Sequence, residues 1–265
     1  MRWLLALLVT TGCSDLLGLD DYQQQAAATV VGSGGSGSGG ESAGGGGSAG
    51  GAFPVQCNGN PLLRDAFDRT VPEGWGIPDE GMAWTTNDDS ETSVADGSGA
   101  IHVVNSNGRA ALVVDTATDV EMVGTVRWAI PSGSFTVMMG GLLLRSNFTN
   151  YIQLNIHHSP TQTPVLALAY TTPADSTLLE QVDLPNGGWS EEGYYMRFQV
   201  FGENPATLRA RVWPRSEAEP AQWHIDVMNS DVDLPQAGGY GAQAYTEDNA
   251  AGVTVFYDDF TVCSK

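Results

Sequence analysis

The chain has little positive charge and no long apolar run after its first residues. It contains 11 lysine and arginine residues against 31 aspartate and glutamate residues, a formal net charge of −20 at pH 7. Phosphate backbones repel a chain this acidic, so nucleic acid is a poor partner. Peripheral binding to anionic lipid is disfavoured for the same reason. Beyond the N-terminus, no stretch is long enough to span a bilayer as an apolar helix.

Residues 1–12 have the features of a secretory signal. Arg2 precedes an apolar core that is too short to span a bilayer, and small residues lead to Cys13. The stretch resembles a bacterial lipoprotein signal, although Thr10 departs from the aliphatic residue usual at that position. This resemblance implies that Cys13 is lipidated and becomes the mature N-terminus, and Ser14 after it implies an outer membrane. An ordinary secretory signal, cut elsewhere, is the alternative.

Residues 13–52 are predicted to be a tether. From 32 to 51 nearly every residue is Gly, Ser or Ala, so this run cannot bury apolar surface and is expected to be a flexible coil. It also lacks the lysine of a phosphate-binding loop. A coil of this length spans about 25 Å root-mean-square. We therefore predict one folded domain, over 53–265, held away from the lipid surface.

Cysteine is scarce, with 3 in the chain. If Cys13 carries lipid, Cys57 and Cys263 remain as a pair that brackets the domain. A disulfide between them would stabilise the fold by up to about 5 kcal/mol through the entropy of the unfolded chain. Such a bond persists in an oxidising compartment, in agreement with an exported protein.

Short alternating apolar runs recur from residue 62 onward, separated by turns rich in Gly, Pro, Asn and Asp. No segment shows the sustained period of an amphipathic helix. So many strands in one domain favour two stacked antiparallel sheets over a small barrel. The predicted strands are 62–67, 83–86, 100–104, 109–115, 119–129, 135–146, 150–158, 164–171, 177–184, 194–202, 206–214, 222–228, 239–245 and 253–262.

The last predicted strand changes face in its middle. Tyr257 continues the apolar parity of the first half, whereas Phe260 begins the opposite parity. A bulge of one residue at Asp258 and Asp259 would reconcile the two halves. We predict that this strand closes the domain beside its first strand.

Several segments resemble concanavalin A-like, or laminin-G-like, jelly-roll modules of secreted bacterial proteins. They are LLRDAFDRTVPEGWG with MAWTT, the hairpin YYMRFQVFGENPATLRARVWPRSEAEPAQWHIDV, GGYGAQAY and the closing VFYDDFTV. The resemblance extends over about 62–262 and implies an all-β, two-sheet antiparallel sandwich. It implies no single function, because modules of this fold serve as lectin, adhesion, accessory and catalytic domains.

The resemblance also implies a structural calcium ion. In many such carbohydrate modules the first and last strands share this ion through a terminal pair of aspartates. The candidate ligands here are Asp65, Asp258 and Asp259, with Asp68 near the first of them. Hard oxygen ligands suit calcium. The alternative is that these carboxylates are edge charges facing solvent.

Strand alternation turns polar side chains outward on several predicted strands. If these rows share one sheet, they form a surface of amides, guanidinium groups and aromatic edges suited to sugar hydroxyls and rings. The alternative is an ordinary half-exposed sheet on which arginine covers apolar surface. The predicted ligand-binding residues are Tyr151, Gln153, Asn155, His157, Arg197, Gln199, Arg209 and Arg211.

Catalysis is less favoured by the sequence than binding. The Glu-x-Asp-x-x-Glu strand motif of glucanases with this fold is absent: Asp119 and Glu121 come nearest, but no third acid follows. Lyases of this fold use a Gln-x-His motif, and Gln153 and His157 have a different spacing. We expect a surface-anchored lipoprotein with a non-catalytic domain that binds a carbohydrate or another extracellular polymer. A glycosidase or lyase is one alternative, and a structural or adhesive surface protein is another.

Overall fold

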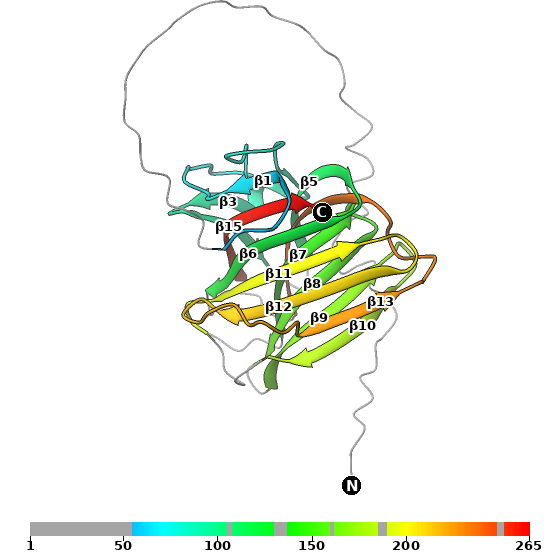
Figure 1. The fold of residues 1–265 in the computed structure, drawn as a ribbon. Coiled ribbons are helices and arrows are strands. Elements are labelled where there is room, and N and C mark those ends of the chain that lie inside the picture. Colours follow the sequence, from blue (N-terminus) through cyan, green and yellow to red (C-terminus); the bar gives the residue numbers. More distant parts are fainter. Residues whose placement is uncertain (1–54, 105–107, 130–136, 160–161, 185–189, 248–251) are drawn as a thin grey trace, which may run out of the picture.

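A computed structural model describes residues 55–104, 108–129, 137–159, 162–184, 190–247 and 252–265. They form two antiparallel β-sheets packed face to face, so the predicted all-β two-sheet sandwich is confirmed (Figure 1). The predicted signal, Cys13 and the tether fall within residues 1–54, outside the described residues. The described part of the chain contains no helix with the length and apolar character needed to cross a bilayer.

One sheet has eight strands in the order β13-β12-β11-β6-β15-β4-β3, with β1 also paired to β15. Strand β15 pairs with β6 on one side; on the other side its first half pairs with β4 and its second half pairs with β1. The strands are β1 Asn60–Asp65, β3 Thr92–Ala95, β4 Ser98–Val103, β6 Val120–Ala129, β11 Tyr194–Phe201, β12 Ala206–Pro214, β13 Ile225–Asn229 and β15 Val253–Ser264.

The other sheet has seven strands in the order β10-β9-β8-β7-β14-β5-β2. Strands β7, β8, β9 and β10 follow one another in the sequence, and each pairs with the next as a hairpin. Strand β14 comes from a distant part of the sequence and lies between β7 and β5. The strands are β2 Thr85–Thr86, β5 Gly108–Ala117, β7 Val137–Ser146, β8 Tyr151–Ser159, β9 Gln162–Thr171, β10 Ser176–Asp183 and β14 Gly238–Glu247.

Each predicted strand overlaps a strand of the structure, and β3 is the one described strand that the sequence did not predict. β3 is four residues long, follows the 3-10 helix η3 (Asp89–Glu91), and forms a tight hairpin with β4. A run this short gives too few alternations to stand out from a turn.

The core between the sheets includes a cluster of aromatic rings near the first and last strands. Trp75 lies edge-on to both Phe67 and Trp84, with ring centroids 5.1 and 5.0 Å apart, and Phe260 lies 5.7 Å from Phe67. Gly124 of β6 makes room for this packing, because a Cβ there would lie 2.1 Å from the Phe260 ring.

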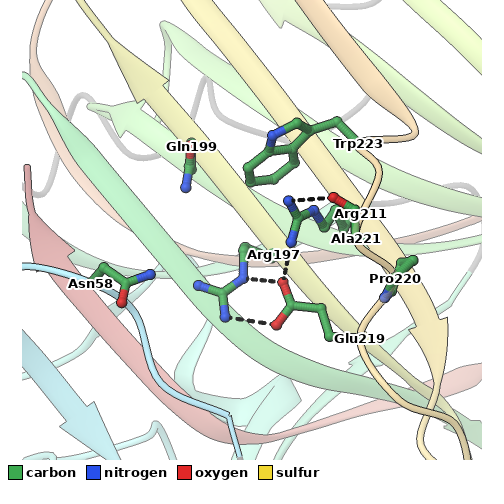
Figure 2. A pocket seen from close by; sticks show the side chains of 8 residues that line it. All are labelled: Asn58, Arg197, Gln199, Arg211, Glu219, Pro220, Ala221 and Trp223. Atoms are coloured by element: carbon green, nitrogen blue, oxygen red, sulfur yellow. Dashed lines mark hydrogen bonds and ion pairs between the residues drawn. The ribbon is translucent and has the colours of Figure 1, made fainter.

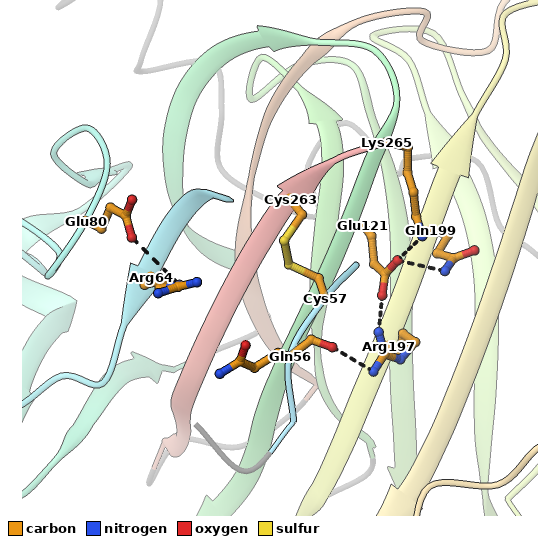
Figure 3. Close-up of a disulfide and its surroundings, with 9 residues drawn as sticks. All are labelled: Gln56, Cys57, Arg64, Glu80, Glu121, Arg197, Gln199, Cys263 and Lys265. Carbon is orange, nitrogen blue, oxygen red and sulfur yellow. Dashed lines mark hydrogen bonds and ion pairs between the residues drawn. A yellow bond between two sulfur atoms is a disulfide. The ribbon is translucent and has the colours of Figure 1, made fainter. Parts of the chain in front are cut away.

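The two ends of the domain lie side by side, as predicted. β1 pairs antiparallel with β15, and the Cys57–Cys263 disulfide joins them with a Cα–Cα distance of 5.9 Å (Figure 3). Between Asp258 and Thr261, β15 has one residue more than the stretch of β6 with which it pairs, which confirms the predicted bulge. Asp259 adopts a left-handed φ of 55° there. As a result, Tyr257 and Phe260 both reach the core.

Candidate functional site

The predicted arginines lie on two adjacent strands of the eight-stranded sheet. In the β11–β12 hairpin, Arg197 stands opposite Arg211, and Gln199 stands opposite Arg209. The residues of the other parity on these strands belong to the core, so these four side chains face away from it. The core residues are Met196, Phe198, Val200, Leu208, Ala210 and Val212.

The segment between β12 and β13 lies beside this polar row and bounds a hollow of about 360 Å³. Figure 2 shows the guanidinium groups of Arg197 and Arg211 turned toward the same carboxylate, that of Glu219. Trp223 lies next to Arg211 in the same view. The residues that line the hollow are Asn58, Arg197, Gln199, Arg211, Glu219, Pro220, Ala221 and Trp223.

Arg197 is fixed from three sides. Its Nε and Nη2 donate to the two carboxylate oxygens of Glu219 at 2.7 and 2.9 Å, a bidentate arrangement that fixes the plane of the guanidinium. Nη2 also donates to the backbone oxygen of Gln56 at 3.0 Å, and Nη1 donates to Glu121. With so many partners and 6% of its surface exposed, Arg197 holds one orientation.

Glu121 of β6 is the buried counter-charge beneath the hollow. It has no exposed surface and accepts hydrogen bonds from Arg197, from Lys265 and, at 2.9 Å, from Gln199 Nε2 (Figure 3). Two cations compensate one carboxylate, as a buried charge requires. Glu121, one of the two acids that come nearest to a glucanase motif in the sequence, is therefore enclosed by its partners and stabilises the fold.

Arg211 joins the carboxylate to the aromatic side of the hollow. Its Nη1 donates to Glu219 at 2.9 Å and its Nη2 donates to the backbone oxygen of Ala221 at 3.0 Å. The guanidinium lies 3.9 Å from the ring centroid of Trp223, a close cation–π contact. Trp223 itself is half-buried, so part of its ring remains available at the surface.

A second hollow, of about 450 Å³, adjoins the first. Tyr195 and Trp213 are paired across the strands and stack with ring centroids 5.6 Å apart and an interplanar angle of 26°. The residues that line this hollow are Val55, Gln56, Tyr195, Arg197, Trp213, Arg215, Glu217, Ala218 and Glu219.

The cations of this face are matched by carboxylates. Besides the pairs of Arg197 and Arg211, Arg209 Nε donates to Asp226 at 2.9 Å, outside the lining of the first hollow. Arg215 Nη2 lies 3.8 Å from Asp259. The face therefore combines many hydrogen-bonding groups with little net charge.

The predicted row on β8 does not join this surface. β8 pairs with β7 and β9 in the seven-stranded sheet, whereas β11 pairs with β6 and β12 in the other sheet. The condition that all the predicted polar residues share one sheet is therefore wrong. The alternation of side chains predicted which face each strand turns outward, but it carries no information on which sheet holds the strand.

On β8, the amides are engaged chiefly with one another. Asn155 Nδ2 donates to Gln153 Oε1 at 2.8 Å, and Gln153 Nε2 donates to Thr171 at 3.2 Å. Gln243 of β14, which the sequence did not single out, donates to Asn155 Oδ1 at 2.8 Å. All of these amides are buried.

The two ends of the β8 row differ from its middle. Tyr151 packs in a small apolar cluster with Leu143 and Phe148. Burial lowers the pKa of His157 to about 4, which leaves this imidazole neutral at pH 7. The β8 row thus offers fewer free polar groups than the hollow on the opposite sheet.

Asp65, the first of the predicted calcium ligands, is fully committed to protein donors. Arg69 donates to its two oxygens at 2.6 and 2.8 Å, Trp84 Nε1 donates at 2.6 Å, and the backbone N–H of Phe67 donates at 2.9 Å. The carboxylate is also completely buried. It has no oxygen directed toward a shared cation.

Asp258 and Asp259 lie at the β15 bulge and face a cation of the protein instead. Their oxygens are 4.0 and 3.8 Å from Arg215 Nη2. Burial, together with the charge of Asp259, raises the pKa of Asp258 to about 7. Within the described ranges, no group of three or more His, Cys, Asp or Glu residues is arranged to hold a metal. Asp65 is thus bound by protein donors, and Asp258 and Asp259 lie near Arg215, whereas a calcium ion needs several converging oxygens.

Sequence reasoning did not identify Glu219 or Asn58 as members of the site. Both lie outside regular strands, where no periodicity indicates direction. Trp223 falls within the predicted strand 222–228, but its contact with Arg211 depends on the path of the segment before β13. The sequence could have indicated Glu219 only as an acidic residue in the loop after 206–214, a strand that contains Arg209 and Arg211.

No family model matches the sequence, and neither does any curated protein. Among solved structures, the carbohydrate-binding module CBM66 from Bacillus subtilis aligns with a TM-score of 0.52 and 12% identity, covering 68% of this chain and 95% of that one. The CBM2 module of the evolved Dit of Lactobacillus casei BL23 phage J-1 aligns at 0.51 and 12%, covering 78% and 96%.

A third similar structure is that of an enzyme. A prokaryotic β-1,3-1,4-glucanase (lichenase) derived from a mouse hindgut metagenome aligns with a TM-score of 0.51 and 10% identity, covering 77% of this chain and 99% of the glucanase. At these identities the similarity establishes the fold alone. The described domain therefore has the concanavalin A-like lectin and glucanase jelly-roll fold, which carbohydrate-binding modules and a glucanase share.

Proposed function

We propose that the domain is a non-catalytic binding module for a neutral carbohydrate, and that its site is the hollow between β11, β12 and the segment before β13. The observation that carries this proposal is the arrangement of Arg197, Arg211 and Trp223. Two guanidinium groups fixed by Glu219 stand beside a partly exposed indole. Fixed donors and an aromatic surface are the groups that bind sugar hydroxyls and sugar rings.

The site is held in place before any ligand arrives. Arg197 has partners on Glu121, Glu219 and Gln56, so its side chain loses little conformational entropy on binding. Arg211 Nε is buried and has no hydrogen-bond partner among the described residues.

The charge of the face favours a neutral ligand over an anionic one. Arg197, Arg209 and Arg211 each have a carboxylate partner within 2.9 Å. An acidic polymer would have to displace these internal carboxylates, and the whole chain carries a net charge of −20. Repulsion of like charges would therefore oppose it.

A binding role is favoured over hydrolysis because the acid beneath the hollow is not free. Glycosidases use a pair of carboxyl groups, whereas here Glu121 is enclosed by Arg197 and Lys265, and Glu219 accepts hydrogen bonds from Arg197 and Arg211. Two of the similar structures are carbohydrate-binding modules, which supports a carbohydrate as ligand. The glucanase among them keeps hydrolysis as the alternative to be tested.

We further propose that the module is exported and anchored to the bacterial outer membrane. The anchor would be a lipid on Cys13 exposed by removal of residues 1–12, and residues 13–52 would tether the domain. Mass spectrometry of the membrane fraction tests this directly. We expect an acylated N-terminal peptide that starts at Cys13, and Cys13→Ser should release the protein from the membrane.

The binding proposal is tested with a glycan array, followed by calorimetric titration of every neutral glycan that binds. We expect Trp223→Ala and Arg211→Ala to weaken binding at least tenfold. Met228→Ala is the matched control, because Met228 is 76% exposed on β13 but does not line the hollow.

Two outcomes would contradict the proposal. Binding unchanged by Trp223→Ala and Arg211→Ala, in proteins with normal melting temperatures, would place the site elsewhere. Release of shorter sugars from a bound glycan, detected by chromatography of the mixture, would show an enzyme and favour the alternative.

A further inference from the structure

The two hollows on the eight-stranded sheet are consecutive parts of one groove. They share Arg197 and Glu219 in their linings. Along β11, Gln199 lines the first hollow and Tyr195 lines the second, with Arg197 between them. Because alternate residues of a strand face the same side, these three side chains follow one line across the surface.

The length of this line exceeds that of one sugar ring. Tyr195 and Gln199 are four residues apart, and an antiparallel strand rises about 3.4 Å per residue, so their Cα atoms are separated by about 14 Å. The volumes of the two hollows, about 360 and 450 Å³, are also comparable to each other. Neither hollow is a minor extension of its neighbour.

The Arg197–Glu219 ion pair lies between the two hollows, because both residues line both of them. The Arg197 side chain is 7% exposed and that of Glu219 is 24% exposed. Arg197 is also held down by the Gln56 backbone oxygen and by buried Glu121. A ligand that extends from one hollow to the other therefore passes this fixed ion pair.

Each hollow has its own aromatic component. Half-buried Trp223 lines the first, and the stacked Tyr195–Trp213 pair, with 7% and 3% of its surface exposed, lies at the base of the second. A ligand with a repeated ring can place one ring against Trp223 in the first hollow and the next ring in the second hollow.

We infer that the groove binds a linear neutral polysaccharide along β11, with one sugar unit at Trp223 in the first hollow and another in the second hollow. The linkage between them would cross the Arg197–Glu219 pair. This inference rests on the proposed function and adds to it: the ligand is an extended chain, and a single sugar or the end of a chain fills only part of the site.

Length-graded oligosaccharides test the inference by calorimetric titration of the full chain. The probes are cello-, malto- and fructan oligosaccharides, each as disaccharide, tetrasaccharide and hexasaccharide. We expect affinity to rise at least tenfold from disaccharide to hexasaccharide in the series that binds, because a longer chain occupies both hollows in one binding event.

Two variants that fill the hollows locate the effect. Ala218 lines the second hollow and Ala221 lines the first, and both are exposed, so a larger side chain at either position leaves the core intact. Ala218→Trp should reduce hexasaccharide affinity to that of the disaccharide and leave disaccharide affinity within twofold. Ala221→Trp should weaken both. Ala174→Trp, at an exposed turn between β9 and β10, is the matched control.

The outcomes separate this inference from the proposed function. Affinity independent of chain length, or hexasaccharide binding unaffected by Ala218→Trp, would overturn the extended groove and leave the proposed site in the first hollow. Absence of binding in all three series would overturn both.

Discussion

The buried ion pair between Glu121 and Arg197 gives the sharpest test of how the site is built. In Arg197→Met the volume of the side chain is roughly kept, but Glu121, which has no exposed surface, loses one of its two cations. Glu219 loses its bidentate partner as well. Removing one member of a buried pair is costly because the other charge stays buried.

The size of the loss follows from the partners that remain. A broken buried pair costs about 3–5 kcal/mol in free energy of unfolding. Glu121 keeps Lys265 and Gln199, so we expect the lower end, about 3 kcal/mol. For a domain of this size that corresponds to a decrease in melting temperature of about 6–12 °C. Arg64→Met is the matched control: Arg64 is 40% exposed and lies 3.7 Å from Glu80, so we expect a loss below about 1 kcal/mol.

Urea unfolding with the disulfide oxidised measures these losses, provided that the slope of free energy against urea stays constant. Glu121→Gln in the Arg197→Met background should recover part of the stability, because the uncompensated charge is then absent. The double-mutant cycle should give a coupling of at least about 1 kcal/mol. Additive losses, or a loss for Arg197→Met no larger than that of the Arg64 control, would refute the assigned pair.

Three further predictions concern the ends of the domain. Cys57→Ser with Cys263→Ser should lower the free energy of unfolding by up to about 5 kcal/mol, and an unchanged urea midpoint would contradict the closure. Burial raises the pKa of Asp258 from 3.8 to about 7, so the folded state binds this proton more tightly than the unfolded state does. The stability that comes from the protonated carboxyl is therefore lost as the pH rises from about 4 to about 7. Asp258→Asn should therefore raise the melting temperature above pH 7 and change it little near pH 4, whereas an equal effect at both pH values would contradict the shift. A chelator should leave the melting temperature unchanged, because the groups that donate to Asp65 are protein groups of Phe67, Arg69 and Trp84; a clear decrease would show a bound metal.

The sequence predicted the strands and their faces well because both depend on local patterns. Alternation identified Met196 and Phe198 as core residues and Arg197 as outward-facing from a few neighbours alone. The bulge in β15 could be predicted for the same reason: the parity of apolar residues changes between Tyr257 and Phe260.

The assignment of strands to sheets could not be predicted in this way. β8 and β11 carry similar polar rows, yet β8 pairs with β7 and β9 while β11 pairs with β6 and β12. Sheet order is set by pairings between distant segments, such as β6 with β15, that a single sequence does not encode as a local pattern. The predicted ligand surface was therefore divided between two sheets.

The residues expected to bind calcium have protein partners that the sequence did not indicate. The sequence correctly placed acids at both ends of the domain, and those ends do pair. A carboxylate can be satisfied by protein donors as readily as by a metal, however, and Arg69 and Trp84 supply those donors to Asp65. Neither residue lies at a spacing that marks it as a partner in the sequence.

The candidate site depends on the closure of the chain as much as on β11 and β12. Gln56 and Asn58 precede β1, and Lys265 follows β15, yet the first two line the groove and Lys265 pairs with Glu121 beneath it. The Cys57–Cys263 disulfide lies between these contributions (Figure 3). The Gln56 backbone oxygen helps to orient the guanidinium of Arg197, which lines the first hollow. If the segment around Gln56 became mobile, Arg197 would therefore lose one of the contacts that fix its orientation. Stability of the closure and order in the binding groove are therefore coupled through the same few residues, although those residues lie at opposite ends of the domain's sequence.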